Sequence, residues 1–258
     1  MAMYDNENTV RASFDLSYIS EYLVQAQWAE FIELKKVITE IAGRNKRRVT
    51  ILDVGVGNAR IPKHLCGIKD IWDKVAFYDG TDNAMACVDI SNTEIKKLNI
   101  GDKVAAHYFD AANLDKWNKK YDMVISTWFT AGNFYPDDFS FDSYKDSGKK
   151  LNLATNEKFT TIFRNAYNLL NPGGEVVIGA CYLDNESTRL KQEESYHKMG
   201  MNLITDESDS FSATREGFWS QRFTKEKIFN YLSFIPREKF TFTALDTYEY
   251  AMQVRIRK

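Results

Sequence analysis

The pattern of hydrophobic and polar positions predicts helices that alternate with short, buried strands. Near the N-terminus, apolar residues mostly follow an i, i+3, i+4 spacing, which predicts one amphipathic helix or two, ending near Gly43. These residues are Ile19, Tyr22, Leu23, Ala26, Phe31, Leu34, Val37, Ile38 and Ile41. Residues 49–54 then form a nearly all-apolar run, which is typical of a strand that helices cover on both faces. A parallel sheet is therefore expected.

Further apolar runs predict strands over residues 86–89, 104–109, 121–127 and 175–181, with helical stretches between them. One helix is clear from the spacing of Phe159, Ile162, Phe163, Ala166, Leu169 and Leu170. It is expected to end at residues 171–174, where Asn-Pro-Gly-Gly breaks the helix and permits a tight turn. The tail alternates apolar and polar residues over 239–243 and, less regularly, over 248–257, which predicts an antiparallel edge hairpin.

The composition is that of an ordinary globular protein. The chain has 258 residues, 44% of them hydrophobic and 27% charged, which argues against disorder and against a membrane protein. The apolar runs are all much shorter than the roughly 20 residues of a membrane span, and the polar start does not resemble a signal peptide, so a cytoplasmic location is expected. Because the net charge is −2, a nucleic-acid partner is not expected. The three cysteines are far apart, which predicts core residues rather than disulfides or a zinc site.

A glycine-rich turn follows the first predicted strand and is the first candidate site. Gly55, Gly57 and the small Ala59 let the backbone approach a ligand closely, with Asn58 between them. The helix that follows offers unpaired amide groups at the same place. Asp53 puts a carboxylate near the end of the strand, where it would repel a pyrophosphate but attract a cationic amino group or sulfonium. The turn therefore favours a nucleotide-like ligand that carries positive charge.

A second acidic position is Asp89, which we expect at the end of the second strand. Ser91 and Glu94 have the capping-box spacing of a helix start, which supports this placement. A carboxylate there accepts bonds from both ribose hydroxyls, and Ile90 offers an apolar face to adenine.

The ribose partner has alternatives, because residues 74–83 are interpreted as an insertion that contains Asp79 and Asp82. The third acidic position, Asp110, stands just before Ala111 at the end of the strand predicted over 104–109. Its carboxylate is suited either to the adenine amino group or to a helix N-cap.

Taken together, these motifs resemble those of the class I S-adenosylmethionine-dependent methyltransferases over roughly residues 45–183. The matching elements are residues 52–57, 88–91, 109–111, 121–126 and 170–174. The resemblance implies an α/β, Rossmann-like fold with a seven-stranded, mainly parallel sheet, helices on both faces and a reversed last strand. It also implies S-adenosylmethionine as the methyl donor and S-adenosylhomocysteine as the product. The chain departs from the pattern at Asn58-Ala59, where a third glycine is frequent.

The resemblance also implies roles for the motif residues. The methionine end of the cofactor would be held by Asp53, Gly55 and Gly57. The ribose would be bound by Asp89 and the adenine by Asp110. The residues beside the sulfonium would be Ser126, Thr127 and Trp128.

By the same resemblance, the chain divides into an N-terminal helical cap over residues 1–44 and a methyltransferase domain over 45–258. Residues 182–222 would be a substrate-recognition insertion after the fifth strand. Candidate pocket residues in it are Tyr196, His197, Phe218 and Trp219, with His197 also a candidate proton acceptor. The N-terminal aromatics Tyr4, Tyr18, Tyr22 and Trp28 either close over the cofactor or pack within helices.

The segment after the fourth predicted strand indicates what kind of methyl acceptor to expect. Residues 126–129 carry no metal-binding carboxylate, so the transfer is expected to be metal-independent. Residues 130–136 look like the Gly-Asn-Phe-x-Pro segment of the ergothioneine-pathway histidine α-amine methyltransferases. This resemblance makes Asn133 the leading candidate for orienting the substrate. The alternative is that Asn133 is only a turn residue beside Gly132.

The favoured function is methyl transfer to a nitrogen or oxygen nucleophile of a small molecule, by a monomer or homodimer. The alternatives are a tRNA or protein methyltransferase, a non-catalytic S-adenosylmethionine-binding protein and a nicotinamide-dependent oxidoreductase.

Overall fold

The computed structural model describes residues 20–144, 150–245 and 250–258. The expectations for Tyr4, Tyr18 and Ile19 lie outside the described residues. The helices are α2 (Glu21–Asn45), α3 (Arg60–Cys66), α4 (Lys69–Trp72), α5 (Met85–Lys97), η1 (Ala111–Lys116), η2 (Thr130–Asn133), α6 (Phe141–Tyr144), α7 (Glu157–Asn168), α8 (Glu186–Lys198), α9 (Lys225–Tyr231) and η3 (Arg237–Lys239). The strands are β1 (Val49–Val54), β2 (Val75–Asp82), β3 (Val104–Tyr108), β4 (Tyr121–Ser126), β5 (Leu170–Tyr182), β6 (Phe211–Ala213), β7 (Trp219–Gln221), β8 (Phe240–Ala244) and β9 (Ala251–Arg257).

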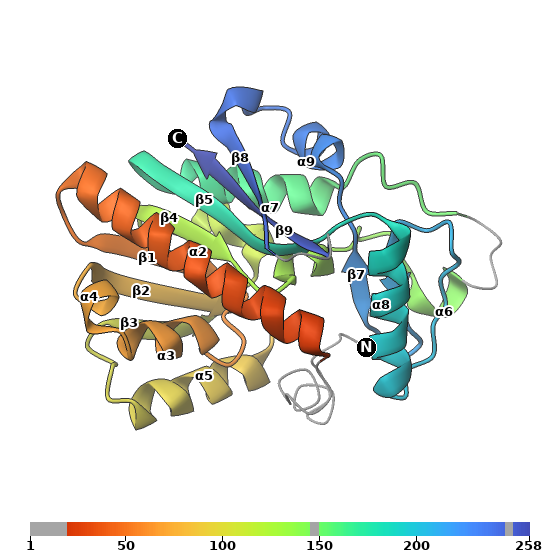
Figure 1. The fold of residues 1–258 in the computed structure, drawn as a ribbon, viewed down its shortest axis with the longest axis horizontal. Helices are drawn as coiled ribbons and strands as arrows, with labels where there is room; N and C mark the ends of the chain where they lie inside the picture. Colours follow the sequence, from red (N-terminus) through yellow and green to blue (C-terminus); the bar gives the residue numbers. More distant parts are fainter. Residues whose placement is uncertain (1–19, 145–149, 246–249) are drawn as a thin grey trace.

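Seven strands form one twisted sheet in the order β3-β2-β1-β4-β5-β9-β8 (Figure 1). The first five of these strands pair in parallel, whereas β9 runs antiparallel to both β5 and β8. This arrangement confirms the expected mainly parallel sheet and the antiparallel tail hairpin. The chain leaves β1 toward β2 on one side and later returns through β4 on the other. Open α/β sheets bind ligands at the carboxyl ends of the strands beside such a switch point.

Helices cover both faces of the sheet and bury one apolar cluster on each. On one face, α2, α3 and α5 contribute residues such as Leu34, Leu65 and Ile95. On the other face, Phe159 of α7 and Ile228 of α9 pack on the opposite side of the same strands. Figure 1 shows α2 crossing in front of the sheet and α7 lying behind it. Among the helices of the described ranges, none combines the length and apolar character that crossing a membrane requires.

The prediction of a strand over residues 86–89 is wrong, because these residues belong to α5. Cys87, Ser91 and Ile95 are buried at intervals of four residues, which is the period of a helix face rather than of a strand. The capping-box interpretation fails for the same reason, since Ser91 lies inside the helix and its Oγ donates a hydrogen bond to the Gly57 carbonyl at 2.8 Å. The second strand is β2, within residues 74–83 that the sequence pattern presents as an insertion.

Residues 182–222 contain α8 and the two-stranded β6-β7 sheet, which lie together beyond the end of β5 (Figure 1). Their centre is aromatic, with the Phe211 and Trp219 rings stacked at 4.0 Å between centroids. Arg222 is buried, and its Nη1 donates hydrogen bonds of 2.8 Å to Gln192 Oε1 of α8 and to Ser212 Oγ of β6. These bonds tie the helix to the small sheet.

Gly179 of β5 lies where no larger side chain fits, and this gives a stability prediction. A Cβ there would lie 2.1 Å from Glu30 Oε1 and 2.9 Å from the Thr127 Cα. We expect Gly179→Ala to lower the free energy of unfolding by about 2–4 kcal/mol, because either the buried carboxylate or the backbone has to move. The measurement is urea unfolding followed by circular dichroism.

Gly43→Ala is the matched control, since a Cβ on this helical glycine would meet no atom within 4 Å. It should raise stability by about 0.5–1 kcal/mol through helix propensity. Equal effects of the two substitutions would contradict the steric account of Gly179.

Candidate active site

A cavity of about 500 Å³ opens at the carboxyl ends of β1, β2, β3 and β4. This volume is within the usual range for small-molecule sites. Residues that follow successive strands line it, together with the start of α7 and the segment around β7. The sequence-predicted site residues among them are Gly55, Gly57, Asn58, Asp110, Ala111, Thr127, Trp128 and Asn133. The lining also includes the alternative ribose partner Asp82 and the pocket candidate Trp219, together with Arg60, Tyr135 and Lys158.

The glycine turn after β1 has the backbone conformation that its sequence suggests. Gly55 and Gly57 have φ values of +84° and +58°, and a Cβ on Gly55 would lie 2.5 Å from Thr130 Cγ2. Ala59, at the position where a third glycine is frequent, also has a left-handed φ of +57°. A non-glycine residue costs about 1–2 kcal/mol in this conformation, which explains why glycine suits the position. Backbone atoms of this turn therefore line the cavity without a side chain at Gly55 and Gly57.

Asp82, not Asp89, is the acid at the end of β2. Its Oδ2 accepts a hydrogen bond from the Gly57 amide and its Oδ1 one from the Ala84 amide, each at 3.0 Å. Burial raises its pKa above the ordinary value. Asp89 is exposed on α5, and neither it nor Ile90 is among the lining residues. The expected position of Asp89 at a strand end is therefore wrong, and the alternative Asp82 occupies it.

The other alternative, Asp79, is fully buried in the middle of β2. Its carboxylate accepts a hydrogen bond from Tyr121 OH, and it pairs with Lys119 Nζ at 3.1 Å and with His107 Nε2 at 2.9 Å. Both oxygens thus have protein partners, so Asp79 is part of the framework of the sheet rather than of the cavity.

Asp110 follows β3 at the cavity, where the sequence places it. Its Oδ1 accepts a hydrogen bond from the Ala112 amide at 2.9 Å and caps η1. The N-cap interpretation is therefore confirmed, and Asp110 also lines the cavity. A carboxylate has capacity for further bonds, so capping leaves Asp110 able to accept one from a ligand.

Asp53 lies behind the glycine turn and is not one of the lining residues. It is 1% exposed, and its Oδ2 accepts a hydrogen bond of 2.5 Å from Tyr78 OH. Burial raises the pKa of Asp53 to about 7, although the bond from Tyr78 and the charge of Arg60 act in the opposite direction. The role of Asp53 at the methionine end of a cofactor stays a prediction. Ser126, buried at the end of β4, also lies outside the lining.

Glu30 of α2, which the sequence analysis does not single out, joins four elements behind the cavity. It is fully buried, and its Oε2 accepts a hydrogen bond of 2.7 Å from Arg60 Nη2. Its Oε1 accepts from the amides of Trp128 at 2.9 Å and Ala180 at 2.7 Å. The signal in the sequence is a charged residue in the apolar stripe of a helix, four residues after Ala26 and four before Leu34.

Arg60, the partner of Glu30 in this ion pair, is itself a lining residue of the cavity. Its guanidinium carbon lies 5.2 Å from the centroid of the Trp128 ring, a cation–π geometry. Within the described part of the chain, its buried Nη1 has no hydrogen-bond partner. A ligand carboxylate in the cavity would satisfy this donor.

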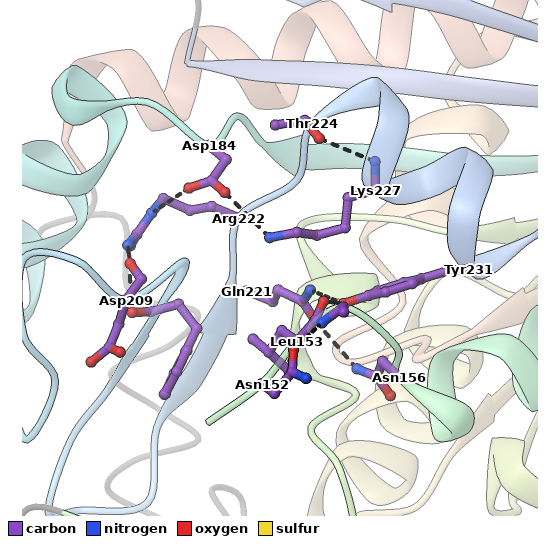
Figure 2. A network of polar contacts seen from close by, with 12 residues as sticks. Asn152, Leu153, Asn156, Asp184, Asp209, Gln221, Arg222, Thr224, Lys227 and Tyr231 are labelled. Atoms are coloured by element: carbon purple, nitrogen blue, oxygen red, sulfur yellow. Dashed lines mark hydrogen bonds and ion pairs between the residues drawn. The ribbon is translucent and has the colours of Figure 1, made fainter. Parts of the chain in front are cut away.

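A buried polar network holds the loop after β4 that carries Asn133 (Figure 2). Asn156 Nδ2 donates hydrogen bonds to the Phe134 carbonyl at 2.8 Å and to Gln221 Oε1 at 3.2 Å. Gln221 Nε2 donates to Tyr231 OH at 2.8 Å, and this hydroxyl donates to the Leu153 carbonyl at 2.6 Å. The loop is thus fixed to α7, α9 and β7.

Of the candidate pocket residues after β5, the cavity lining contains Trp219. Tyr196 and Phe218 are buried against each other, with ring centroids 6.1 Å apart. His197 is exposed in the last turn of α8 and is not a lining residue. Tyr22 packs on Tyr250 at 5.1 Å, as the helix-packing interpretation predicts.

Comparison with known proteins places the fold. No family model matches the sequence, and no curated protein matches it. The structure of the CcbJ methyltransferase from Streptomyces caelestis is similar with a TM-score of 0.61 at 13% identity, over 99% of this chain and 98% of that one. Magnesium protoporphyrin IX methyltransferase (ChlM) from Synechocystis PCC 6803, with bound SAH, gives 0.56 at 13% identity over 97% and 92%. The chain has the class I methyltransferase fold.

A third similar structure is an O-methyltransferase family protein from Burkholderia thailandensis, with a TM-score of 0.53 at 13% identity. The match covers 88% of this chain and 55% of that one, so this chain spans about half of that protein. The methyltransferase fold accounts for the order of the strands and for the position of the cavity at their carboxyl ends.

The raised pKa of Asp53 gives a prediction for stability against pH. Between about pH 4 and pH 7 the folded protein keeps a proton that the unfolded chain, with its ordinary pKa of 3.8, has released. Asp53 therefore lowers stability progressively as pH rises through this window, and no further above it. We expect the stability of Asp53→Asn relative to the parent to rise over the window by roughly 2–4 kcal/mol.

The measurement is urea unfolding of both proteins at several pH values. Tyr78→Phe is the companion variant, because losing the hydroxyl that lowers the pKa of Asp53 should extend the window to higher pH. Parallel stability curves for the parent and Asp53→Asn would contradict this account.

Proposed function

We propose that this protein transfers a methyl group from S-adenosylmethionine to a nitrogen or oxygen atom of a small molecule. The observation that carries the proposal is the convergence of the glycine turn, Asp82 and Asp110 on one cavity at the carboxyl ends of β1, β2 and β3. In two similar structures of the same fold, the bound molecule is S-adenosylhomocysteine, the product of this cofactor.

The residues at the cavity fit such a cofactor. The left-handed turn at Gly55 and Gly57 gives room for the methionine end. Arg60 Nη1, which has no partner among the residues that the structure describes, suits the carboxylate of that end. Asp82 retains acceptor capacity for the ribose hydroxyls, and Asp110 retains it for the adenine amino group. Thr127 and Trp128 line the cavity after β4, where the resemblance puts the sulfonium.

The chain's own contribution to the reaction is positioning and exclusion of water. Bound S-adenosylmethionine would supply an activated methyl group: the nucleophile would bond to the methyl carbon as the carbon–sulfur bond breaks, the electron pair would stay on sulfur, and the proton of the nucleophile would leave to a base or to water. We propose that Asn133, a lining residue on a fixed loop, orients the nucleophile. Residues 182–222 would cover this side of the cavity, through Gly217 and Trp219.

Binding of the ribose should depend on Asp82 and not on Asp89, although both side chains are carboxylates. We expect Asp82→Asn to weaken binding of S-adenosylhomocysteine by about 10- to 100-fold, because one acceptor oxygen is replaced by a donor. Asp89→Asn, on the exposed face of α5, should bind as the parent does. Isothermal titration calorimetry measures both. Equal affinities of the two variants would contradict the assignment of Asp82, and no binding by the parent protein would contradict the proposed function.

Asn133 is tested through the acceptor. With an acceptor found by screening amines, amino acids and phenols for S-adenosylhomocysteine release, Asn133→Ala should lower kcat/KM by about 10- to 100-fold. Its affinity for S-adenosylhomocysteine should stay within about twofold of the parent. Asn118→Ala, an exposed asparagine outside the cavity lining, is the control. A parallel loss of cofactor affinity would show that Asn133 shapes the cofactor site instead.

A further inference from the structure

One part of the cavity combines aromatic rings with a cation, and we call it the acceptor cleft. It consists of Phe134 and Tyr135 in the loop after β4, Lys158 of α7 and Trp219 of β7. The rings of Tyr135 and Trp219 lie 6.0 Å apart at 56°, and the stacked Phe211 backs Trp219. These rings give a planar ligand rigid apolar surfaces to pack on.

Lys158 lies in the first turn of α7, at the positive end of a 12-residue helix. A cation is disfavoured there by the helix dipole, whereas an anion is favoured. Its side chain is 26% exposed, and its Nζ lies 5.1 Å from the centroid of the Tyr135 ring. The ammonium and the helix dipole therefore add to a positive potential at the aromatic wall.

The partner of Lys158 is Asp137, whose side chain is 83% exposed. Nζ and Oδ1 are 2.9 Å apart. An ion pair with so exposed a carboxylate contributes little to stability, so a ligand anion can replace Asp137 at small cost. The ion pair marks a position where Lys158 already binds a carboxylate oxygen.

Trp219 adds an unused hydrogen-bond donor to the same wall. The residue is 1% exposed, and its Nε1 has no hydrogen-bond partner in the part of the chain that the structure describes. A buried donor without a partner is unfavourable, and a ligand oxygen relieves it. The donors of the acceptor cleft thus suit a ligand that carries acceptor oxygens.

We infer that the acceptor cleft binds a planar aromatic methyl acceptor that carries a carboxylate, with its ring against Tyr135 and Trp219 and its carboxylate on Lys158. The inference rests on the proposed function, because it names the substrate class of the same site. Asn133 is next to the cleft in the same loop, where it meets the nucleophilic substituent of the ring.

The test uses protein saturated with S-adenosylhomocysteine and two matched pairs of probes. Salicylate and anthranilate carry the carboxylate, while salicylamide and anthranilamide keep the ring and the nucleophile without the charge. Calorimetry should show the carboxylates binding at least about tenfold more tightly than their amides. Lys158→Met should abolish this preference and Lys158→Arg should keep it, with S-adenosylhomocysteine affinity and circular dichroism unchanged in both.

Asp137→Asn is the sharpest variant, because it removes the competing carboxylate and leaves the cavity lining intact. It should tighten binding of the carboxylates about two- to fivefold and leave the amides unaffected. The inference is overturned if the amides bind as well as the carboxylates, if Lys158→Met keeps the preference, or if no carboxylate binds to the saturated protein. Failure of S-adenosylhomocysteine to bind at all would instead refute the proposed function.

Discussion

The geometry of the site depends on the hydrogen bonds that the buried Glu30 carboxylate accepts. It is buried without solvent contact, and among the described residues its carboxylate accepts hydrogen bonds from Arg60 and from the amides of Trp128 and Ala180. Those bonds connect α2 to the start of α3, to the turn after β4 and to β5. Removing any one partner leaves a buried charge under-satisfied, so the elements around the cavity keep one relative position. Gly179 is required because this carboxylate occupies the space beside its Cα.

The sheet could be predicted from the sequence where strands are mostly apolar, as in β1 and β4, and where a glycine turn marks the strand end, as after β1. β2 could not, because it contains Asp79, Gly80 and Asp82, which are uncommon in strands. Asp79 is tolerated because Tyr121, Lys119 and His107 surround its carboxylate, and these partners come from distant segments. The apolar residues of α5 look like a strand in a short window, and only their spacing over two turns reveals a helix.

One half of the candidate site could likewise be predicted from the sequence, and the other half could not. The half formed by the glycine turn and Asp110 follows local rules, since each residue stands within three positions of the end of a strand. The acceptor cleft depends on contacts between residues far apart in sequence. Asn156, two residues before Lys158, bonds to the carbonyl of Phe134, which precedes Tyr135, and to Gln221 in the strand of Trp219. No local pattern encodes such a network, and of the cleft residues only Trp219 is among the pocket candidates taken from the sequence.

Both walls of the cavity are built on strained backbone. Ala59, Trp128 and Phe129 have φ values of +57°, +53° and +61°, each costing about 1–2 kcal/mol for a side chain with a Cβ. Contacts around these residues offset this cost. The Glu30 carboxylate accepts hydrogen bonds from the Trp128 amide and from the side chain of Arg60, which follows Ala59. The Phe129 ring stacks on Tyr182 with 3.7 Å between centroids. Such strain persists where the surrounding structure over-determines the backbone conformation. The two turns after β1 and β4 therefore present a preformed cavity, which limits the ordering that binding has to supply.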